Sequence, residues 1–122
     1  GCIKMRISIY VDGAGGPNGG FGYFVKETGE SFYEKKPEIT NNQAEYMAII
    51  TALKKFADSG EEIIIFSDSK NTISQLNHEF AINNEKLREL AREAWTLVGK
   101  FSKLTLLWVP RKENLAGKML GS

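Results

Sequence analysis

The sequence is poor in several features that mark whole classes of protein. Cys2 is the only cysteine, so an internal disulfide bond is impossible, and with a single histidine, His78, a zinc site of Cys and His ligands is not expected. No apolar run approaches the roughly 18 to 20 residues of a membrane-spanning helix. Lys4 and Arg6 also interrupt any signal-peptide pattern at the start. We therefore expect a cytoplasmic protein that does not associate with membranes.

Net charge of either sign is nearly absent as well. The 16 Lys and Arg residues balance 15 Asp and Glu residues, which leaves a formal net charge of +1. Overall charge therefore gives no argument for nucleic-acid binding, and any such binding must depend on local contacts. The 122 residues, 42% of them hydrophobic, suffice for one domain with a buried core. Because no repeat or linker divides the chain, we expect one domain over residues 1–122. We also expect a monomer, and no protein partner is evident from the sequence.

What the chain does contain is a succession of strand and helix patterns. Strict alternation of apolar and polar residues predicts the first strand, a glycine-rich loop follows it, and a continuous apolar run predicts a strand covered on both faces. Strands are expected at residues 5–11, 21–26, 31–36, 63–66 and 104–109, and helices at about 40–58, 71–76 and 84–100, with a short last helix from 113. This β-β-β-α-β-α-α-β order predicts an α/β fold with a five-stranded mixed sheet and helices on both faces.

Three acidic residues are expected to meet at one end of this sheet. Asp12 directly follows the first strand, and Asp68 comes two residues after the 63–66 run, so both should emerge at the same end of parallel strands. Glu45 lies in line with the apolar face of its helix and should point toward the sheet. Gathered carboxylates repel one another unless a hard cation such as Mg2+ is bound. Two such ions, roughly 4 Å apart, would suit phosphodiester hydrolysis.

Each of these acids also has an ordinary structural explanation. Asp12 precedes Gly13 and could be a turn residue, while Asp68 could cap the helix that follows it. Glu45 could take part in a capping interaction near its helix start. The metal-site interpretation therefore depends on the three side chains falling together.

Four segments of the chain resemble the motifs of type 1 ribonuclease H. They are Tyr10-Val11-Asp12-Gly13-Ala14, Thr40-Asn41-Asn42-Gln43-Ala44-Glu45, Phe66-Ser67-Asp68-Ser69 and Trp108-Val109-Pro110-Arg111-Lys112-Glu113-Asn114-Leu115-Ala116. The resemblance spans nearly the whole chain and implies a ribonuclease H-like fold of the subgroup without a basic protrusion. It implies an endonuclease that cuts the RNA strand of RNA–DNA hybrids with two Mg2+ ions, for which Mn2+ can substitute. Asp12, Glu45 and Asp68 would be the catalytic metal ligands.

The resemblance also implies a set of residues that bind the substrate. Asn41 and Asn42 would lie in the minor groove of the hybrid and contact ribose 2′-hydroxyls, although both could merely cap their helix. Thr40, together with Asn84, would grip a phosphate of the DNA strand. The glycine-rich loop would let the backbone approach the RNA strand, and the residues implied there are Gly13, Ala14 and Asn18.

Two positions depart from the family pattern. The fourth acid of the family is expected where this chain has Gly117, so one metal ion would be held less well and activity weakened. Glu113 lies a turn away and is not expected to compensate. Arg111 stands where many relatives have a histidine; its charge could steady developing negative charge, or it could simply face solvent.

Three other functions remain open at this stage. A hybrid-binding domain with impaired cleavage would follow from Gly117 and would show no turnover of hybrid with Mg2+ or Mn2+. A receiver-like domain phosphorylated on aspartate would begin with a parallel βαβ unit rather than a hairpin. A DNA-cutting nuclease or integrase core would share the acidic cluster, but would cut duplex DNA.

Overall fold

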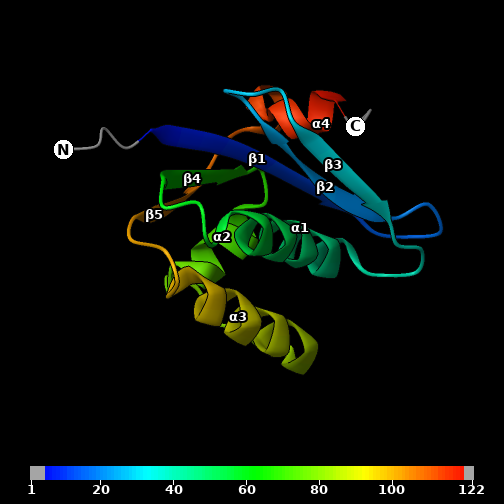
Figure 1. The fold of residues 1–122 in the computed structure, drawn as a ribbon. Helices are drawn as coiled ribbons and strands as arrows, with labels where there is room; N and C mark the ends of the chain where they lie inside the picture. The colour runs from blue at the N-terminus through cyan, green and yellow to red at the C-terminus, as the bar shows by residue number, and fades with distance from the viewer. Residues whose placement is uncertain (1–4, 120–122) are drawn as a thin grey trace.

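One mixed sheet organises the chain in the computed structural model, which describes residues 5–119 (Figure 1). Its strands are β1 (Arg6–Ala14), β2 (Gly20–Val25), β3 (Ser31–Lys35), β4 (Glu62–Ser67) and β5 (Leu104–Trp108). They lie in the order β3-β2-β1-β4-β5, so β1 is central. The β1–β2 and β2–β3 pairs are antiparallel, whereas β1–β4 and β4–β5 are parallel. The predicted five-stranded mixed sheet is therefore confirmed.

Helices cover both faces of this sheet. They are α1 (Asn41–Phe56), α2 (Lys70–Leu76), α3 (Glu85–Val98) and α4 (Leu115–Met119), with a 3-10 turn at Arg111–Glu113. Helix α1 packs on β1 and β2, and α3 packs on α1, while α4 lies on the opposite face against β1 and β2 (Figure 1). None of the helices described is long and apolar enough to cross a bilayer.

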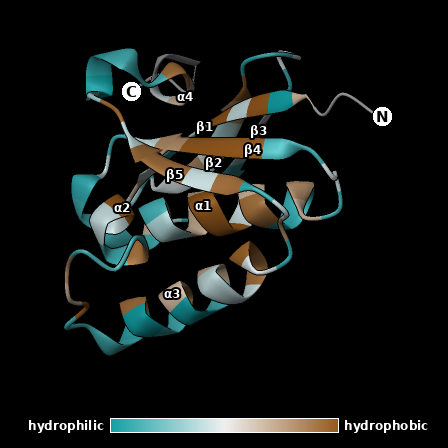
Figure 2. Ribbon diagram, turned by 90° about the vertical axis from the view of Figure 1, so that its left-hand side faces the viewer, coloured by the Kyte–Doolittle hydropathy of each residue, from teal (hydrophilic) through white to brown (hydrophobic). Residues whose placement is uncertain are grey.

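The core lies between α1 and the central strands. Ile9 and Ile65, which are paired across β1 and β4, are both fully buried, and Leu53 of α1 is fully buried in the same cluster. Figure 2 shows the hydrophobic colour concentrated along the central strands and α1, whereas α3 carries much of the hydrophilic colour. The apolar residues that gave the strand and helix patterns in the sequence thus pack together in one buried layer.

The largest departure from the predicted boundaries concerns the first strand. It continues to Ala14, because Asp12, Gly13 and Ala14 pair with Gly22, Phe21 and Gly20 of β2. The glycine-rich loop therefore begins later than expected, and the prediction that Asp12 follows the strand is wrong. Pairing with β2 overrides the local preference of an Asp-Gly sequence for a turn.

Candidate active site

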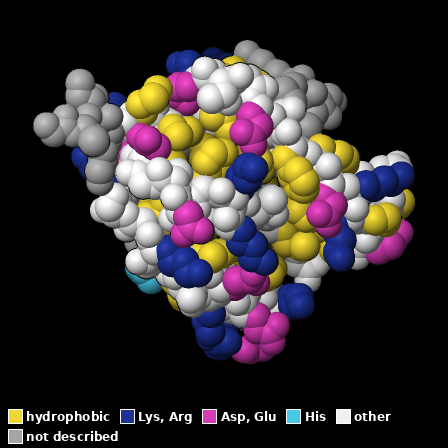
Figure 3. All heavy atoms as spheres, viewed as in Figure 1, with side chains coloured by type: hydrophobic (Ala, Val, Ile, Leu, Met, Phe, Trp, Pro, Cys, Tyr) yellow, Lys and Arg dark blue, Asp and Glu magenta, His cyan; other side chains and the backbone are white. Residues whose placement is uncertain are grey.

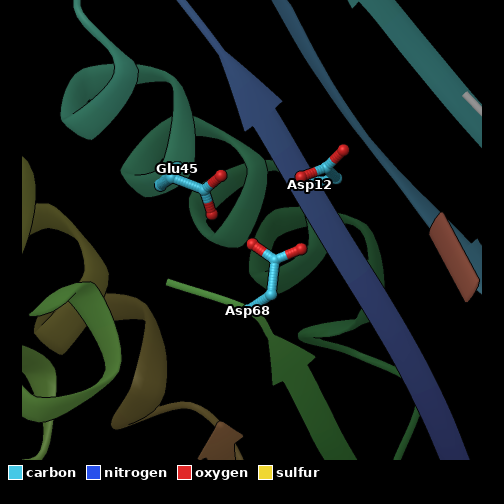
Figure 4. Close-up of side chains that lie close together, drawn as sticks. All are labelled: Asp12, Glu45 and Asp68. Atoms are coloured by element: carbon cyan, nitrogen blue, oxygen red, sulfur yellow. The ribbon is translucent and has the colours of Figure 1, made fainter. Parts of the chain in front are cut away.

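The three acids predicted to meet do so at one end of the sheet (Figure 4). Asp12 comes from β1, Glu45 from α1, and Asp68 directly follows β4. One carboxylate oxygen from each lies within 4.8 Å of the others. Asp12 is 9% exposed and Glu45 is 7% exposed, so two of the carboxyl groups are largely withdrawn from water. This arrangement suits a shared divalent cation.

The ordinary explanations for these acids do not hold. Helix α1 begins with a capping box formed by Thr40 and Gln43, so Glu45 has no capping role. Helix α2 is capped by the hydroxyl of Ser69, not by Asp68. Asp12 belongs to a paired strand and not to a turn. Local capping and turn roles therefore do not explain why the three acids are present.

Glu45 is held by two hydrogen bonds, one at each oxygen. The backbone N–H of Gly13 donates to Oε1 at 3.2 Å, and the hydroxyl of Ser67 donates to Oε2 at 3.2 Å. Burial raises the pKa of Glu45 to about 8, assisted by the negative charges of Asp12 and Asp68 and opposed by these two bonds. Without a cation, Glu45 therefore carries a proton at neutral pH.

Gly13 allows this contact because α1 approaches β1 so closely. A Cβ atom at Gly13 would lie 2.4 Å from the carbonyl carbon of Ala44 and 2.8 Å from the backbone nitrogen of Glu45. At Gly15, a Cβ atom would lie 2.3 Å from the carbonyl oxygen of Ile39. The small size of these two glycines thus lets the start of α1 pack against the sheet, a role that the sequence pattern did not indicate.

Asn114 is a site residue that sequence reasoning missed. It is fully buried, and its Nδ2 donates to Asp68 Oδ2 at 3.0 Å and to the carbonyl oxygen of Val11 at 2.9 Å. Its Oδ1 accepts from the N–H of Ala116 at 3.0 Å. One amide thus joins the chain beside Asp12, the carboxylate of Asp68 and the start of α4. The one sequence feature that could have identified Asn114 as a site residue is its position in the fourth motif, residues 108–116.

The two departures from the family pattern lie close to Asn114 in the chain. Gly117 is buried within α4, three residues after Asn114, and this position bears no carboxylate. Arg111 is exposed in the 3-10 turn, and its catalytic role stays a prediction. Glu113 is exposed and is not part of the acidic cluster found among residues 5–119.

The residues predicted to bind substrate are distributed over two helix starts. Thr40 caps α1, and Asn84 caps α3 by accepting from the N–H of Leu87 at 3.0 Å. Asn41 does not cap its helix, because its Oδ1 accepts from the N–H of Gly15 at 2.6 Å. Asn42 is exposed, as are Ala14 at the end of β1 and Asn18 in the loop that follows. Their contacts with a substrate stay predictions.

On the face of the molecule shown in Figure 3, positive and negative side chains are interspersed. In the view of Figure 3, Lys and Arg side chains alternate with Asp and Glu side chains and do not merge into one basic area. This distribution agrees with the formal net charge of +1. With so small a net charge, binding of a polyanion would depend on individual contacts and would weaken with added salt.

Comparisons with known proteins place the site in context. A family model described as reverse transcriptase-like matches residues 26–121. The protein of Enterococcus faecalis named "Putative hydrolase EbsB" is 30% identical over 93% of this chain and 90% of its own length. Ribonuclease HI of Halobacterium salinarum is 34% identical over 89% of this chain, which spans only 59% of that protein. The crystal structure of RNase H1 from this archaeon superposes with a TM-score of 0.84 at 31% identity, covering 95% of this chain and 94% of that one.

Proposed function

The chain belongs to the ribonuclease H family, and we propose from its site that it hydrolyses the RNA strand of RNA–DNA hybrids. The observation that carries the proposal is the meeting of Asp12, Glu45 and Asp68, with oxygens within 4.8 Å of one another. They come from β1, from α1 and from the residue after β4, and none serves as a helix cap or a turn residue.

The residues present fit divalent magnesium. The donors are all carboxylate oxygens, which Mg2+ prefers, and the raised pKa of Glu45 reflects how strongly burial and the neighbouring charges disfavour its ionised form. Asp12, Glu45 and Asp68 would hold two ions, with Mn2+ as a substitute. Bound ions would supply activation of a water molecule and charge stabilisation for the leaving oxygen. Asn114 and Gly13 keep two of the carboxylates oriented through their hydrogen bonds.

Capping and substrate binding are compatible in this chain. The Thr40 hydroxyl accepts from the N–H of Gln43 and retains its own hydrogen, which could be donated to a phosphate. Among the hydrogen bonds of residues 5–119, the side chains of Asn41 and Asn84 likewise take part through their oxygens, so their NH2 groups could donate to a substrate. Exposed Asn42 could contact a 2′-hydroxyl, the group that distinguishes RNA from DNA.

Cleavage of a labelled RNA–DNA hybrid, compared with a duplex DNA of the same sequence, tests the proposal. With Mg2+ or Mn2+, we expect cuts in the RNA strand of the hybrid only. Asp68→Asn keeps the side-chain shape but removes a ligand, so its rate should fall by at least about 100-fold. Equal cleavage of duplex DNA, or hybrid cleavage that survives EDTA, would overturn the proposal.

A second candidate, a hybrid-binding domain with impaired cleavage, is favoured by Gly117. Gly117→Asp would add a carboxylate on α4, which packs on β1, and should raise cleavage at limiting Mg2+ by about 10-fold. Gly117→Asn is the matched control, because it adds similar volume without charge. If Gly117→Asp is no faster than the parent at every Mg2+ concentration, position 117 does not serve the metal site.

A further inference from the structure

The hydroxyl of Ser67 lies beside the metal site and is not used in the function proposed above. Ser67 is the last residue of β4 and directly precedes Asp68. Burial alternates along this strand, and Ser67 takes an inward position equivalent to those of Ile63 and Ile65, with 0% of its surface exposed. A polar side chain at such a position is stable only if its hydrogen bonds are made.

The hydrogen bonds of Ser67 have a defined direction. The backbone N–H of Ser69 donates to Ser67 Oγ at 3.0 Å, which leaves the single hydroxyl hydrogen to be donated elsewhere. Glu45 Oε2 lies 3.2 Å from Oγ and accepts this hydrogen. The chain of bonds therefore runs from the Ser69 N–H through the Ser67 hydroxyl to Glu45.

This chain of bonds joins two metal ligands through the protein. The Ser69 N–H belongs to the backbone that leaves Asp68, while the other end of the chain is the carboxylate of Glu45. With Gly13 holding Oε1 and Ser67 holding Oε2, the plane of the Glu45 carboxylate is fixed relative to the end of β4. Hydrogen bonds to ligating groups orient those groups, and their loss commonly weakens metal affinity by about 10- to 100-fold.

We propose that Ser67 is a positioning residue that sets the placement of the Glu45 carboxylate relative to Asp68, and thereby the affinity of the site for divalent cations. The inference rests on the proposed function only in taking the three carboxylates as a metal site. It does not require that the bound hybrid be cut.

The test is the titration of the metal-free protein with MnCl2 in a calorimeter, without nucleic acid. Ser67→Ala should weaken Mn2+ binding by about 10-fold, and Ser67→Thr, which restores the hydroxyl, should recover most of the loss. Ser74→Ala is the matched control: Ser74 is 7% exposed in α2, and no hydrogen bond found among residues 5–119 joins its side chain to the three carboxylates. Its Mn2+ affinity should equal that of the parent.

Kinetics on the hybrid provide a second readout. The Mn2+ concentration for half-maximal rate should rise about 10-fold in Ser67→Ala, while KM for the hybrid stays unchanged and kcat recovers at saturating Mn2+. Unchanged Mn2+ affinity in Ser67→Ala, or an equal loss in Ser74→Ala, overturns the proposal. If the parent binds Mn2+ but does not cut hybrid, the proposed function fails, whereas calorimetry of the Ser67 variants still decides whether this hydroxyl sets metal affinity.

Discussion

The ionised form of Glu45 is disfavoured in the metal-free candidate site. Its carboxyl group is 7% exposed, and burial together with the charges of Asp12 and Asp68 raises its pKa to about 8 from an ordinary value of 4.5. In the metal-free protein the folded state therefore keeps a proton that the unfolded chain releases. A bound cation reverses this preference, because it favours the ionised carboxylate.

Metal affinity should consequently depend on pH. We expect the Mn2+ association constant to rise by about 10-fold per pH unit up to about pH 8 and to level off above it, because below that pH binding must displace the Glu45 proton. Calorimetry in buffers of different ionisation enthalpy should show about one proton released per binding event at neutral pH. A pH-independent affinity between about pH 6 and pH 8 would contradict this role of Glu45.

The raised pKa of Glu45 should also make the stability of the metal-free protein depend on pH. Because the pKa of Glu45 is raised in the folded state, protonation of Glu45 adds to the free energy of unfolding. This contribution is fully present below about pH 4.5 and is lost as pH rises through about 8. Glu45→Gln imitates the protonated form, so the metal-free variant should melt at least about 3 °C above the parent at alkaline pH and should bind no Mn2+. Thermal unfolding followed by circular dichroism across pH provides the measurement, and parallel curves for the two proteins would refute the assignment.

Asn42 allows substrate binding to be separated from metal binding. Its side chain is exposed at the start of α1, and removing one good hydrogen bond should reduce hybrid affinity by about 10-fold. Asn42→Ala should therefore weaken binding of a fluorescent hybrid, measured by anisotropy, and leave Mn2+ titration unchanged. Equal loss of both affinities would count against a 2′-hydroxyl contact.

At the scale of elements, the site depends on the close approach of α1 to β1. The backbone N–H of Gly13 reaches Glu45, and a side chain at Gly13 would meet the backbone of Ala44 at 2.4 Å. The start of helix α1 is defined by the capping box of Thr40 and Gln43. Helix, strand and carboxylate are thus positioned as one unit.

Gly13→Ala should separate these two elements. The added methyl group must displace α1, which should cost about 1 to 3 kcal/mol of unfolding free energy and also weaken Mn2+ binding, since Glu45 moves with its helix. Gly29→Ala is a suitable control, because Gly29 has a φ of +78° and nothing lies within 4 Å of its added Cβ, so that variant should lose stability without losing metal affinity. Chemical denaturation and calorimetry together decide between the outcomes, and tight Mn2+ binding by Gly13→Ala would exclude the coupling.

At the scale of the whole molecule, Asn114 connects the start of α4 to strand β1 through hydrogen bonds. Its amide contacts the carbonyl group of Val11, 103 residues earlier, and also the carboxylate of Asp68. The N–H of Ala116 donates its hydrogen bond to the oxygen of the same side chain. Because Asn114 is fully buried, no water can replace these bonds without rearrangement.

Asn114→Ala should therefore destabilise the entire fold. Two backbone groups would be left unpaired, at a cost of about 1 to 3 kcal/mol each, and the melting temperature should fall by several degrees. Asn114→Asp keeps the shape but places a fourth carboxylate beside Asp68, so its deficit should be larger in EDTA and should shrink when Mn2+ is added. Melting curves of both variants with and without Mn2+ measure this, and an Ala variant that melts like the parent would disprove the anchoring role.

Local patterns in the sequence sufficed to predict the order of strands and helices, because periodicity, capping residues and glycine-rich turns act over a few neighbours. The inward direction of Glu45 followed from helix geometry, and the meeting of three carboxylates followed from the direction of parallel strands. Only the tertiary structure decided that Asp12 lies within a paired strand, that burial raises the pKa of Glu45 to about 8, and that Ser67 and Asn114 donate hydrogen bonds to Glu45 and Asp68. Each of these depends on atoms supplied by distant segments, whose burial and separation no local pattern specifies.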